Sequence, residues 1–312
     1  MTLLIGSLMF YAYGEPIYVL LMLLSIAVNF YMALAIYKKA GHKKIFLIVS
    51  LIYNFGMLFV FKYLGFFISI VNGIIGKDLL VNPELTLPLG ISFYTFQMAS
   101  YVIDVYRGCY EVSNNPLKFA TYVSMFPQLI AGPIVNYSEV EKDLDNRAVK
   151  FSKIEKGASY FIFGLSYKVL LANQIQSLWN DVQTVGVYGI NTATAWLGSI
   201  GFSFQIYFDF FGYSLMAIGL GYIMGFSFPV NFDSPYISTS ATEFWRRWHI
   251  TLGRWFREYV YIPLGGNRVS TKRLVFNTFV VWLLTGLWHG ASFNFIIWGL
   301  FFFVLLTIEK LG

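Results

Sequence analysis

Two of the three histidines in this 312-residue sequence lie in strongly apolar surroundings. His289 lies in the stretch LTGLWHGASFNFIIWG, inside a segment apolar enough to enter a membrane. Ionisable groups at membrane depth are costly and indicate functional sites, and an imidazole can act as a general acid or base near neutral pH. Gly286 and Gly290 flank it and would let another backbone or a substrate approach closely. The alternative is a tight helix crossing with a hydrogen-bonded histidine.

His249 lies in the segment Glu243–Tyr261, EFWRRWHITLGRWFREYVY. At about 100° per residue, the aromatic residues of this segment share one face of a helix and its arginines share the other. The pattern predicts an amphipathic helix in the membrane interface, with His249 on the apolar side. A buried imidazole needs a hydrogen-bond partner, so His249 is either functional or a core histidine bonded to a backbone carbonyl. The arginines are Arg246, Arg247, Arg254 and Arg257, and the apolar face carries Trp245, Trp248, Leu252, Trp255, Phe256 and Tyr259.

Asp209 is a third ionisable residue in an apolar run, surrounded by the aromatic residues of QIYFDFFGYS. It either orients a histidine or an arginine, or it forms a structural ion pair, and the sequence leaves both alternatives open. No metal site is predicted, because the two histidines lack a nearby carboxylate or thiolate and Cys109 is the single cysteine. The sequence also lacks a nucleophile elbow, a P-loop and a dinucleotide fingerprint.

The composition places these residues in a membrane protein. Hydrophobic residues make up 57% and charged residues 12% of the sequence, against about 45–50% and about 25% in soluble domains. Apolar runs of about 20 residues without alternating polar positions predict transmembrane helices rather than tilted strands. Two runs exceed one crossing and contain Lys62 or Asp209, so each is expected to be tilted or broken. The expected spans are Pro16–Tyr37, Ile45–Val71, Leu87–Tyr106, Gly157–Leu178, Trp196–Phe226, Leu274–His289 and Ser292–Ile308.

Most of the 22 basic residues gather in four clusters, which the positive-inside rule assigns to the cytoplasmic side. All four can share that side if Phe119–Val135 enters and leaves the membrane on one face. Pro127, Gly132 and Pro133 would interrupt a spanning helix, so a re-entrant or surface-lying element is predicted there. No cleavable signal peptide is predicted at Met1. The clusters lie at residues 38–44, 107–118, 142–156 and 246–273.

Five stretches resemble, in order, signature segments of the membrane-bound O-acyltransferases, and most of all the branch that acetylates alginate in bacteria. The resemblance covers essentially the whole chain. It implies an all-α polytopic membrane protein, a ring of tilted transmembrane helices with re-entrant and interfacial helices around a central tunnel. It also implies that residues 1–312 form one membrane domain, incomplete at both ends relative to the family. The stretches are Leu87–Gly108, Phe126–Tyr137, Gln205–Phe226, Phe244–Arg268 (FWRRWHITLGRWFREYVYIPLGGNR) and Leu284–Gly299.

The resemblance implies a role for each histidine. The family's Trp-His-Gly histidine, regarded as the catalytic base, is His289 here, and the partner position in its Arg-Arg-Trp-His motif is His249. Transfer of an acyl group from a thioester to a hydroxyl needs such a base, and we expect His249 to position or polarise a reacting group. The donor would be acyl-CoA (acetyl-CoA) or an acyl-carrier-protein thioester, with no bound cofactor and no metal. Further support or donor contacts are expected from Trp248, Trp288, Asp209, Arg246 and Arg247.

The function implied is transfer of an acyl group, acetyl above all, towards an exported cell-surface polysaccharide. The expected partner is a periplasmic or extracellular acetyltransferase-type protein. Membrane lipid is also expected to contact the chain, and nucleic acid is not. The expected location is the bacterial inner membrane, which the chain would cross several times. The alternatives within the superfamily are D-alanyl transfer to teichoic acid and peptidoglycan O-acetylation; Tyr261–Arg268 favours the acetylation branch. Gln128 replaces a histidine found in some alginate-acetylating members, which leaves the acceptor open. A transporter of polysaccharide or lipid, suggested by Lys168 and Asp209, and a non-catalytic secretion scaffold are the alternatives of other classes.

Overall fold

A computed structural model describes residues 1–130, 132–186 and 188–312, and all regular structure among them is helical. This confirms the all-α class. The one pairing of extended backbone in the described residues is an isolated bridge between Phe232 and Trp248. The α-helices are α1 (Thr2–Gly14), α2 (Tyr18–Lys38), α3 (Lys43–Leu58), α4 (Leu64–Ile75), α5 (Ile91–Arg107), α6 (Pro116–Ser124), α7 (Phe126–Leu129), α8 (Tyr137–Asp145), α9 (Phe151–Ser166), α10 (Asn173–Val185), α11 (Thr192–Ile223), α12 (Ala241–Arg247), α13 (Ile250–Phe256), α14 (Thr271–His289) and α15 (Phe293–Leu311).

Some consecutive α-helices are joined by short π-helices and so form one continuous helical run. Short π-helices join α3 to α4 through η2 (Phe59–Tyr63) and α9 to α10 through η3 (Tyr167–Ala172), and another, η5 (Arg257–Tyr261), extends α13. The expected interruption at Lys62 is therefore a local π-helix within one long helical run, whereas the run with Asp209 is the unbroken helix α11. Four helical stretches are long and apolar enough to cross a membrane: Tyr18–Lys38, Ala40–Ile75, Thr192–Ile223 and Phe293–Leu311.

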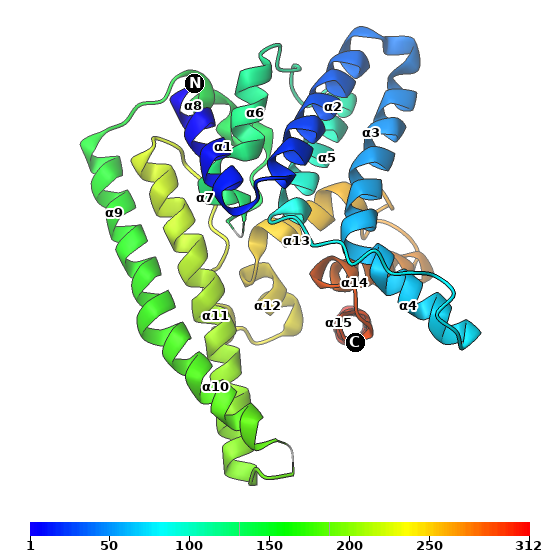
Figure 1. The fold of residues 1–312 in the computed structure, drawn as a ribbon, viewed down its shortest axis with the longest axis vertical. Coiled ribbons are helices and arrows are strands. Elements are labelled where there is room, and N and C mark those ends of the chain that lie inside the picture. Colours follow the sequence, from blue (N-terminus) through cyan, green and yellow to red (C-terminus); the bar gives the residue numbers. More distant parts are fainter. Residues whose placement is uncertain (131, 187) are drawn as a thin grey trace.

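Two helical groups flank the centre of the molecule (Figure 1). The run from α9 to α10 packs along α11 and forms a long pair on one side. Glycines allow this close approach: a Cβ on Gly157 would lie 2.5 Å from the Gly219 carbonyl oxygen, and a Cβ on Gly164 would lie 2.5 Å from that of Gly212. Small residues at such crossings are typical of membrane helix pairs. Gly212 and Gly219 therefore serve close helix packing.

The second group contains α1, α2, α3, α5 and α6. Its interior holds a buried polar cluster, in which Asn29 Nδ2 donates to Asn54 Oδ1 at 2.9 Å and Ser50 Oγ donates to Asn29 Oδ1 at 2.9 Å. Such bonds satisfy polar groups that would otherwise be unpaired in an apolar medium. They tie α2 to α3 across the apolar core.

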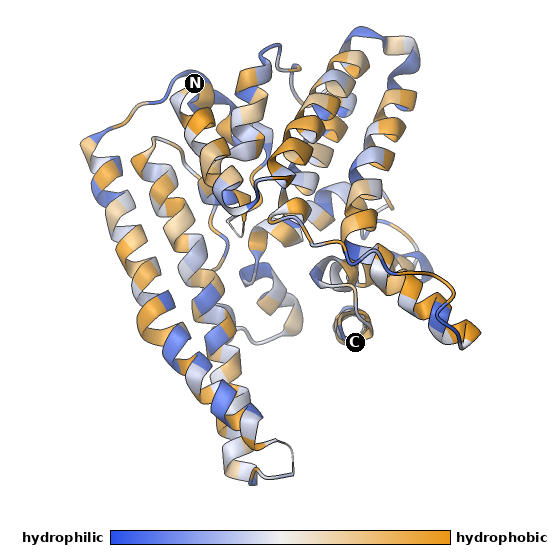
Figure 2. Ribbon diagram, viewed as in Figure 1, coloured by the Kyte–Doolittle hydropathy of each residue, from blue (hydrophilic) through white to orange (hydrophobic). Residues whose placement is uncertain are grey.

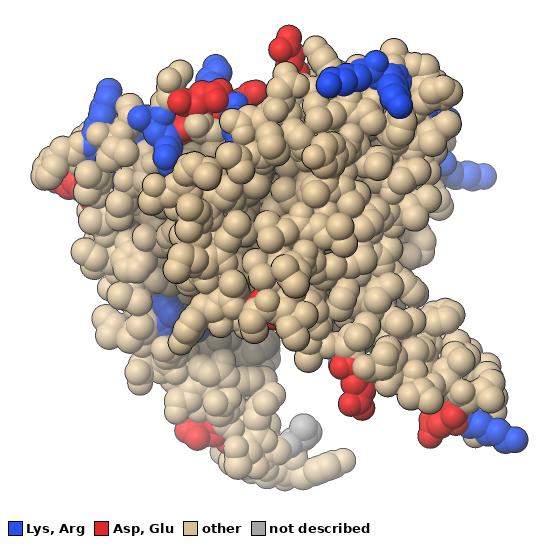
Figure 3. All heavy atoms as spheres, turned by 45° about the horizontal axis from the view of Figure 1, so that its top comes forward, with Lys and Arg blue, Asp and Glu red and all other residues tan. Residues whose placement is uncertain are grey.

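The outer surface is apolar over most of its area. Figure 2 shows hydrophobic residues along the lengths of α2, α3, α4 and α9, with hydrophilic residues concentrated in the loops at the top of the view. In Figure 3 the charged side chains gather along one edge and are sparse on the broad face. Large apolar side chains exposed on the helices, as expected in contact with lipid, include Leu20, Ile52, Ile162, Leu170 and Ile297.

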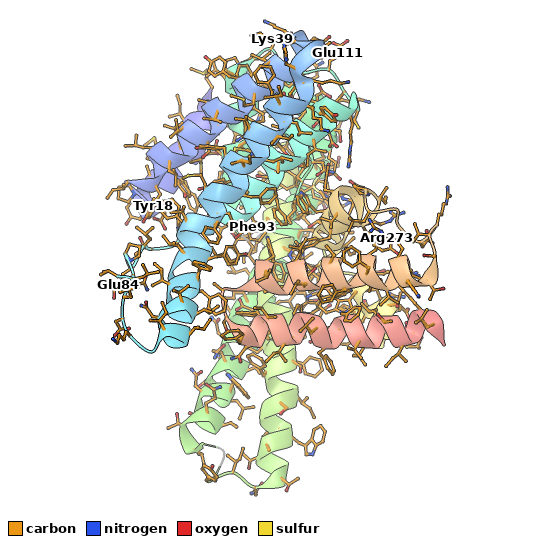
Figure 4. The ribbon with its side chains drawn as sticks, turned by 90° about the vertical axis from the view of Figure 1, so that its right-hand side faces the viewer. Tyr18, Lys39, Glu84, Phe93, Glu111 and Arg273 are labelled. Carbon is orange, nitrogen blue, oxygen red and sulfur yellow. The ribbon has the colours of Figure 1, made fainter. Side chains whose placement is uncertain are left out.

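The segment Phe119–Val135 contains no spanning helix among its described residues, which exclude Ala131. It holds the end of α6 and the four residues of α7, separated at Met125. The prediction of an interrupted element is confirmed, while its membrane face stays a prediction. In Figure 4 the basic loop with Lys39 lies at the top of the view and Arg273 lies far below it, so these two basic clusters are separated along that direction.

The prediction of one interfacial helix over Glu243–Tyr261 is wrong. The helix is broken between α12 and α13, where Trp248 is extended and His249 has φ +45°. The apolar face is buried in the protein rather than laid on a membrane, and Trp255 stacks on Phe96 of α5 at 3.7 Å between ring centroids. The break arises because a distant extended segment bonds to it, with the Asp233 N–H donating to the Arg247 carbonyl at 2.9 Å.

Candidate functional site

The fold brings His249 and His289 to one cavity of about 390 Å³, although 40 residues separate them in the sequence. His249 comes from the break between α12 and α13, and His289 is the last residue of α14. Trp288 contacts both imidazoles, with ring centroids 5.8 Å from His249 and 5.1 Å from His289. We call this space the histidine cavity. Its lining includes Thr242, Trp245, Arg246, Trp248, His249, Arg257, Trp282, Thr285, His289 and Lys310.

His249 is held by a side-chain amide that the sequence reasoning missed. Its Nδ1 lies 3.0 Å from Asn231 Oδ1, and both residues are buried. The left-handed backbone of a non-glycine residue costs about 1–3 kcal/mol and persists only where the surroundings enforce it. Here the Ile250 N–H donates to the Asn231 carbonyl at 3.0 Å and the Phe210 ring packs edge-on at 4.7 Å. The partner of Nδ1 is thus a side-chain amide and not the backbone carbonyl of the structural alternative.

His289 is placed by the crossing of α14 with α15. A Cβ on Gly286 would overlap the Phe295 carbonyl oxygen, and one on Gly290 would overlap the Phe295 ring. The two glycines that flank His289 therefore serve close helix packing rather than the approach of a substrate. Trp298 of α15 lies against the imidazole at 4.8 Å between centroids. Figure 4 shows α14 and α15 side by side, running crosswise to α11.

The end of α14 is held by a second feature that the sequence did not indicate. Lys62 donates from Nζ to the Trp288 carbonyl, and the neighbouring Tyr63 donates from its hydroxyl to the Leu287 carbonyl at 2.7 Å. Both donors lie in the π-helix η2, and such bulges occur frequently at functional sites. The last carbonyls of a helix lack partners within it and carry partial negative charge, so a lysine stabilises them. Phe93, labelled in Figure 4, packs against Trp288 at 5.6 Å between ring centroids.

Asp209 forms an ion pair and does not bond to either histidine. Its Oδ1 lies 2.5 Å from Lys168 Nζ of η3, and Gln205 Nε2 donates to its Oδ2 at 3.3 Å. Of the two alternatives left open by the sequence, the geometry shows the structural ion pair. The pair joins the two long helices beside the site.

The arginines of the broken segment divide into paired and unpaired residues. Arg247 lies within 3.0 Å of Glu243 and 3.3 Å of Asp233, and Arg254 holds Glu139 through two nitrogens at 2.7 and 2.9 Å. Carboxylates of the protein therefore take two of the four arginines that the helical pattern placed on the polar face.

Arg246 and Arg257 have no carboxylate partner among the described residues. Both line the histidine cavity and also a second cavity of about 670 Å³. We call it the arginine cavity. Its cationic lining residues are Arg246, Arg257, Arg268 and Lys310, and its described lining contains no carboxylate.

Trp248 lines the histidine cavity, whereas Trp288 packs against both imidazoles without lining it. Trp248 pairs with Phe232 and stacks on Phe244 at 5.6 Å between centroids. Trp288 also lines a separate apolar cavity of about 420 Å³ between α3–α4 and α13. The indole nitrogen of Trp288 is buried without a hydrogen-bond partner in the described chain. Among all the residues that the structure describes, no group of three His, Cys, Asp or Glu side chains is placed to bind a metal ion.

The sequence matches the model of the membrane-bound O-acyltransferase family over residues 111–311. It is 42% identical to a protein of Pseudomonas aeruginosa named "Probable alginate O-acetylase AlgI", over 99% of this chain and 60% of that protein. It is 39% identical to a peptidoglycan O-acetyltransferase of Helicobacter pylori, over 99% of this chain and 64% of that protein. A teichoic acid D-alanyltransferase of Bacillus subtilis is 30% identical over 70% of this chain. The chain thus spans about 60% of the length of the alginate relative.

Proposed function

We propose that this chain, which belongs to the membrane-bound O-acyltransferase family, carries the active site of an enzyme that moves an acyl group towards an exported cell-surface polysaccharide. The acyl group is acetyl, because the relatives matched over nearly the whole chain are named as O-acetylating proteins. The observation that carries the proposal is the single cavity that His249 and His289 share.

His289 acts as the general base. It takes the proton of an acceptor hydroxyl while that oxygen bonds to the acyl carbon of a thioester. The carbon–sulfur bond then breaks, and the leaving thiolate takes the proton from His289, which returns to its neutral form. Base catalysis by a positioned side chain contributes about 10²–10⁴-fold to such a rate. Trp288 and Lys62 support this role, since they fix the end of the helix that carries the imidazole.

The arginine cavity holds the donor. Acyl-CoA, including acetyl-CoA, and an acyl-carrier-protein thioester both present phosphate on a pantetheine arm, and guanidinium groups bind phosphate through charge-assisted hydrogen bonds. Arg246 and Arg257 line both cavities, so phosphate held there would lie beside the histidine cavity. Arg247, which we also considered as a donor contact, is taken by carboxylates.

The first test is His289→Ala in cells that acetylate the polysaccharide, with protein insertion measured alongside. Loss of at least about 100-fold of acetyl transfer is expected, as for removal of a general base. The matched control is His42→Ala, since His42 is exposed at the end of the short 3-10 helix η1 (Ala40–His42). Normal insertion with full polymer acetylation by the His289→Ala protein would refute the proposal.

The second test addresses the donor. Arg246→Gln and Arg257→Gln are expected to raise the KM for the acyl donor, and Lys272→Gln serves as control because that exposed lysine lies outside both cavities. An unchanged KM in both arginine variants would remove the donor assignment.

The partner and the location complete the proposal. An acyl group taken from a cytoplasmic donor must reach a polymer outside the cell, so a periplasmic or extracellular acetyltransferase-type protein is proposed to receive it from this membrane protein. Four apolar helical stretches support placement in the bacterial inner membrane. A reporter fused within residues 139–155 is expected on the cytoplasmic side, and periplasmic signal there would contradict this topology.

Two other acyl transfers remain within the family. Peptidoglycan O-acetylation is favoured over D-alanyl transfer by the higher identity and coverage of its relative. Analysis of which polymer loses O-acetyl esters in the His289→Ala strain separates the alginate-type and peptidoglycan acceptors from teichoic acid. A non-catalytic scaffold would instead keep its function without either histidine.

A further inference from the structure

We infer that Asn231 holds neutral His249 with its proton on Nδ1, so that Nε2 is a fixed hydrogen-bond acceptor beside the reacting groups. The position of the proton follows from the hydrogen bonds of His249 alone. Only the role given to Nε2 in binding the acceptor hydroxyl rests on the proposed function. The inference decides between the two roles expected for this residue, positioning and polarising.

The first step is the orientation of the Asn231 amide. Its Oδ1 lies 3.3 Å from the Thr251 backbone nitrogen and 2.9 Å from the Thr251 hydroxyl. A backbone N–H can only donate, so the amide atom that faces it must be the oxygen and not the nitrogen. The Ile250 N–H, which donates to the Asn231 carbonyl, fixes the backbone of the same residue.

The second step is the proton on His249. Its Nδ1 lies 3.0 Å from the same amide oxygen, which carries no hydrogen and can only accept. Nδ1 must therefore be the donor. The ring is buried and pairs with no carboxylate among the described residues, which disfavours the charged form. In the neutral imidazole the other nitrogen then has no proton. Nε2 is buried and has no hydrogen-bond partner among the described residues, although His249 lines the histidine cavity.

The third step is the consequence for the reaction. A neutral Nε2 without hydrogen can accept a hydrogen bond from a hydroxyl of the acceptor substrate, but it cannot donate one to the oxyanion that develops on the acyl carbon. His249 therefore positions the hydroxyl-bearing substrate, and the oxyanion must be stabilised by other donors. Asn231 is the positioning residue that sets this polarity.

The packing shows why the arrangement is stable. The extended segment that carries Asn231 bonds to both sides of the helix break, through Asp233 to the Arg247 carbonyl and through Asn231 to Ile250 and Thr251. Asn231, His249 and Thr251 are each at most 3% exposed. Water therefore has little access to replace the amide as the partner of Nδ1.

The experiment is nitrogen NMR of the full chain in lipid nanodiscs, with histidine labelled by ¹⁵N in the ring. The sequence has only three histidines, and a His249→Asn variant assigns the signals of His249. The expected result at neutral pH is one tautomer, with Nδ1 protonated and Nε2 bare. A protonated Nε2, whether in the other tautomer or in the imidazolium, would overturn the inference.

Variants of the supporting residues add a second readout. Asn231→Leu removes the acceptor oxygen, so the His249 signals are expected to move towards those of exchanging tautomers and kcat to fall about 10–100-fold, the range found for groups that orient metal-bound histidines. Asn231→Asp keeps an acceptor oxygen and is expected to keep the proton on Nδ1. Thr251→Ser keeps both donors to that oxygen and is the matched control.

The two readouts separate the inference from the proposed function. The wild-type spectrum needs no turnover, so a protonated Nε2 refutes the tautomer even where acyl transfer is demonstrated. Conversely, full transfer by His289→Ala refutes the function without changing the His249 spectrum.

Discussion

Gly299 of α15 provides a direct test of how closely α14 and α15 must approach to place His289. A Cβ at Gly299 would lie 2.5 Å from the Trp282 carbonyl oxygen and 3.2 Å from the Gly286 Cα, both backbone atoms of α14. Ordinary carbon contacts need about 3.5 Å, so Gly299→Ala must separate the helices by about 1 Å. Backbone atoms cannot turn aside as a flexible side chain does, so the two helices must separate as units.

The expected cost has two parts. Overpacking of this kind destabilises a protein by about 1–3 kcal/mol, which lowers the melting temperature by several degrees. Trp298, the residue before Gly299, lies against the His289 ring at 4.8 Å, so the imidazole is displaced together with the helix. A displacement of about 1 Å at a reacting group can reduce the rate about 100-fold.

The assay combines thermal unfolding in detergent with acetyl transfer to the polysaccharide. The matched control is Gly56→Ala in α3, because a Cβ there meets no atom within 4 Å. Gly56→Ala is expected to leave activity unchanged and to keep or slightly raise the melting temperature, because alanine is the better helix former. If Gly299→Ala behaves like Gly56→Ala in both measurements, the argument that this crossing positions His289 is refuted.

Three further predictions concern the side chains around the site. Lys62→Met removes the donor to the Trp288 carbonyl. Because loss of a charged hydrogen bond costs about 1.5–3 kcal/mol, acetyl transfer and melting temperature should both fall. Unchanged values would show that the bond does not hold α14. Asp209→Asn leaves the Lys168 ammonium without its carboxylate and should lower the melting temperature. Adding Lys168→Met should restore the melting temperature. A double variant that is stable but inactive would favour a functional role for the pair. Arg254→Gln breaks a two-bond pair with Glu139 and should lower the melting temperature without altering the KM for the donor, so a raised KM would contradict the structural role of that arginine.

The helical architecture could largely be predicted from the sequence, because hydropathy and helix breakers are read locally. An apolar run of about 20 residues is long enough to span a membrane, and the expected span Pro16–Tyr37 matches α2, which is such a helix. Leu274–His289 coincides with the helix α14, but α14 is not among the four described stretches that are long and apolar enough to cross a membrane. The two apolar histidines were conspicuous because so few residues are ionisable.

The segment Glu243–Tyr261 shows where local patterning is insufficient. Its helical periodicity is real, yet the helix breaks at His249. Asn231, 18 residues before His249, and Asp233, 14 residues before Arg247, supply bonds that a continuous helix would not need. Hydrophobic periodicity indicates which face of a helix is apolar, but it does not indicate whether a distant segment bonds to the backbone and interrupts that helix.

The sequence by itself determined the class of the protein, its family resemblance and the two histidines, since these depend on residue types and their spacing. Only the tertiary structure decided their partners: Asn231 for His249, Lys62 at the helix end beside His289, and Glu139 for Arg254. The physical reason is distance along the chain, because Lys62 reaches a carbonyl 226 residues away and Arg254 a carboxylate 115 residues away. Such pairings follow from the packing of helices in three dimensions.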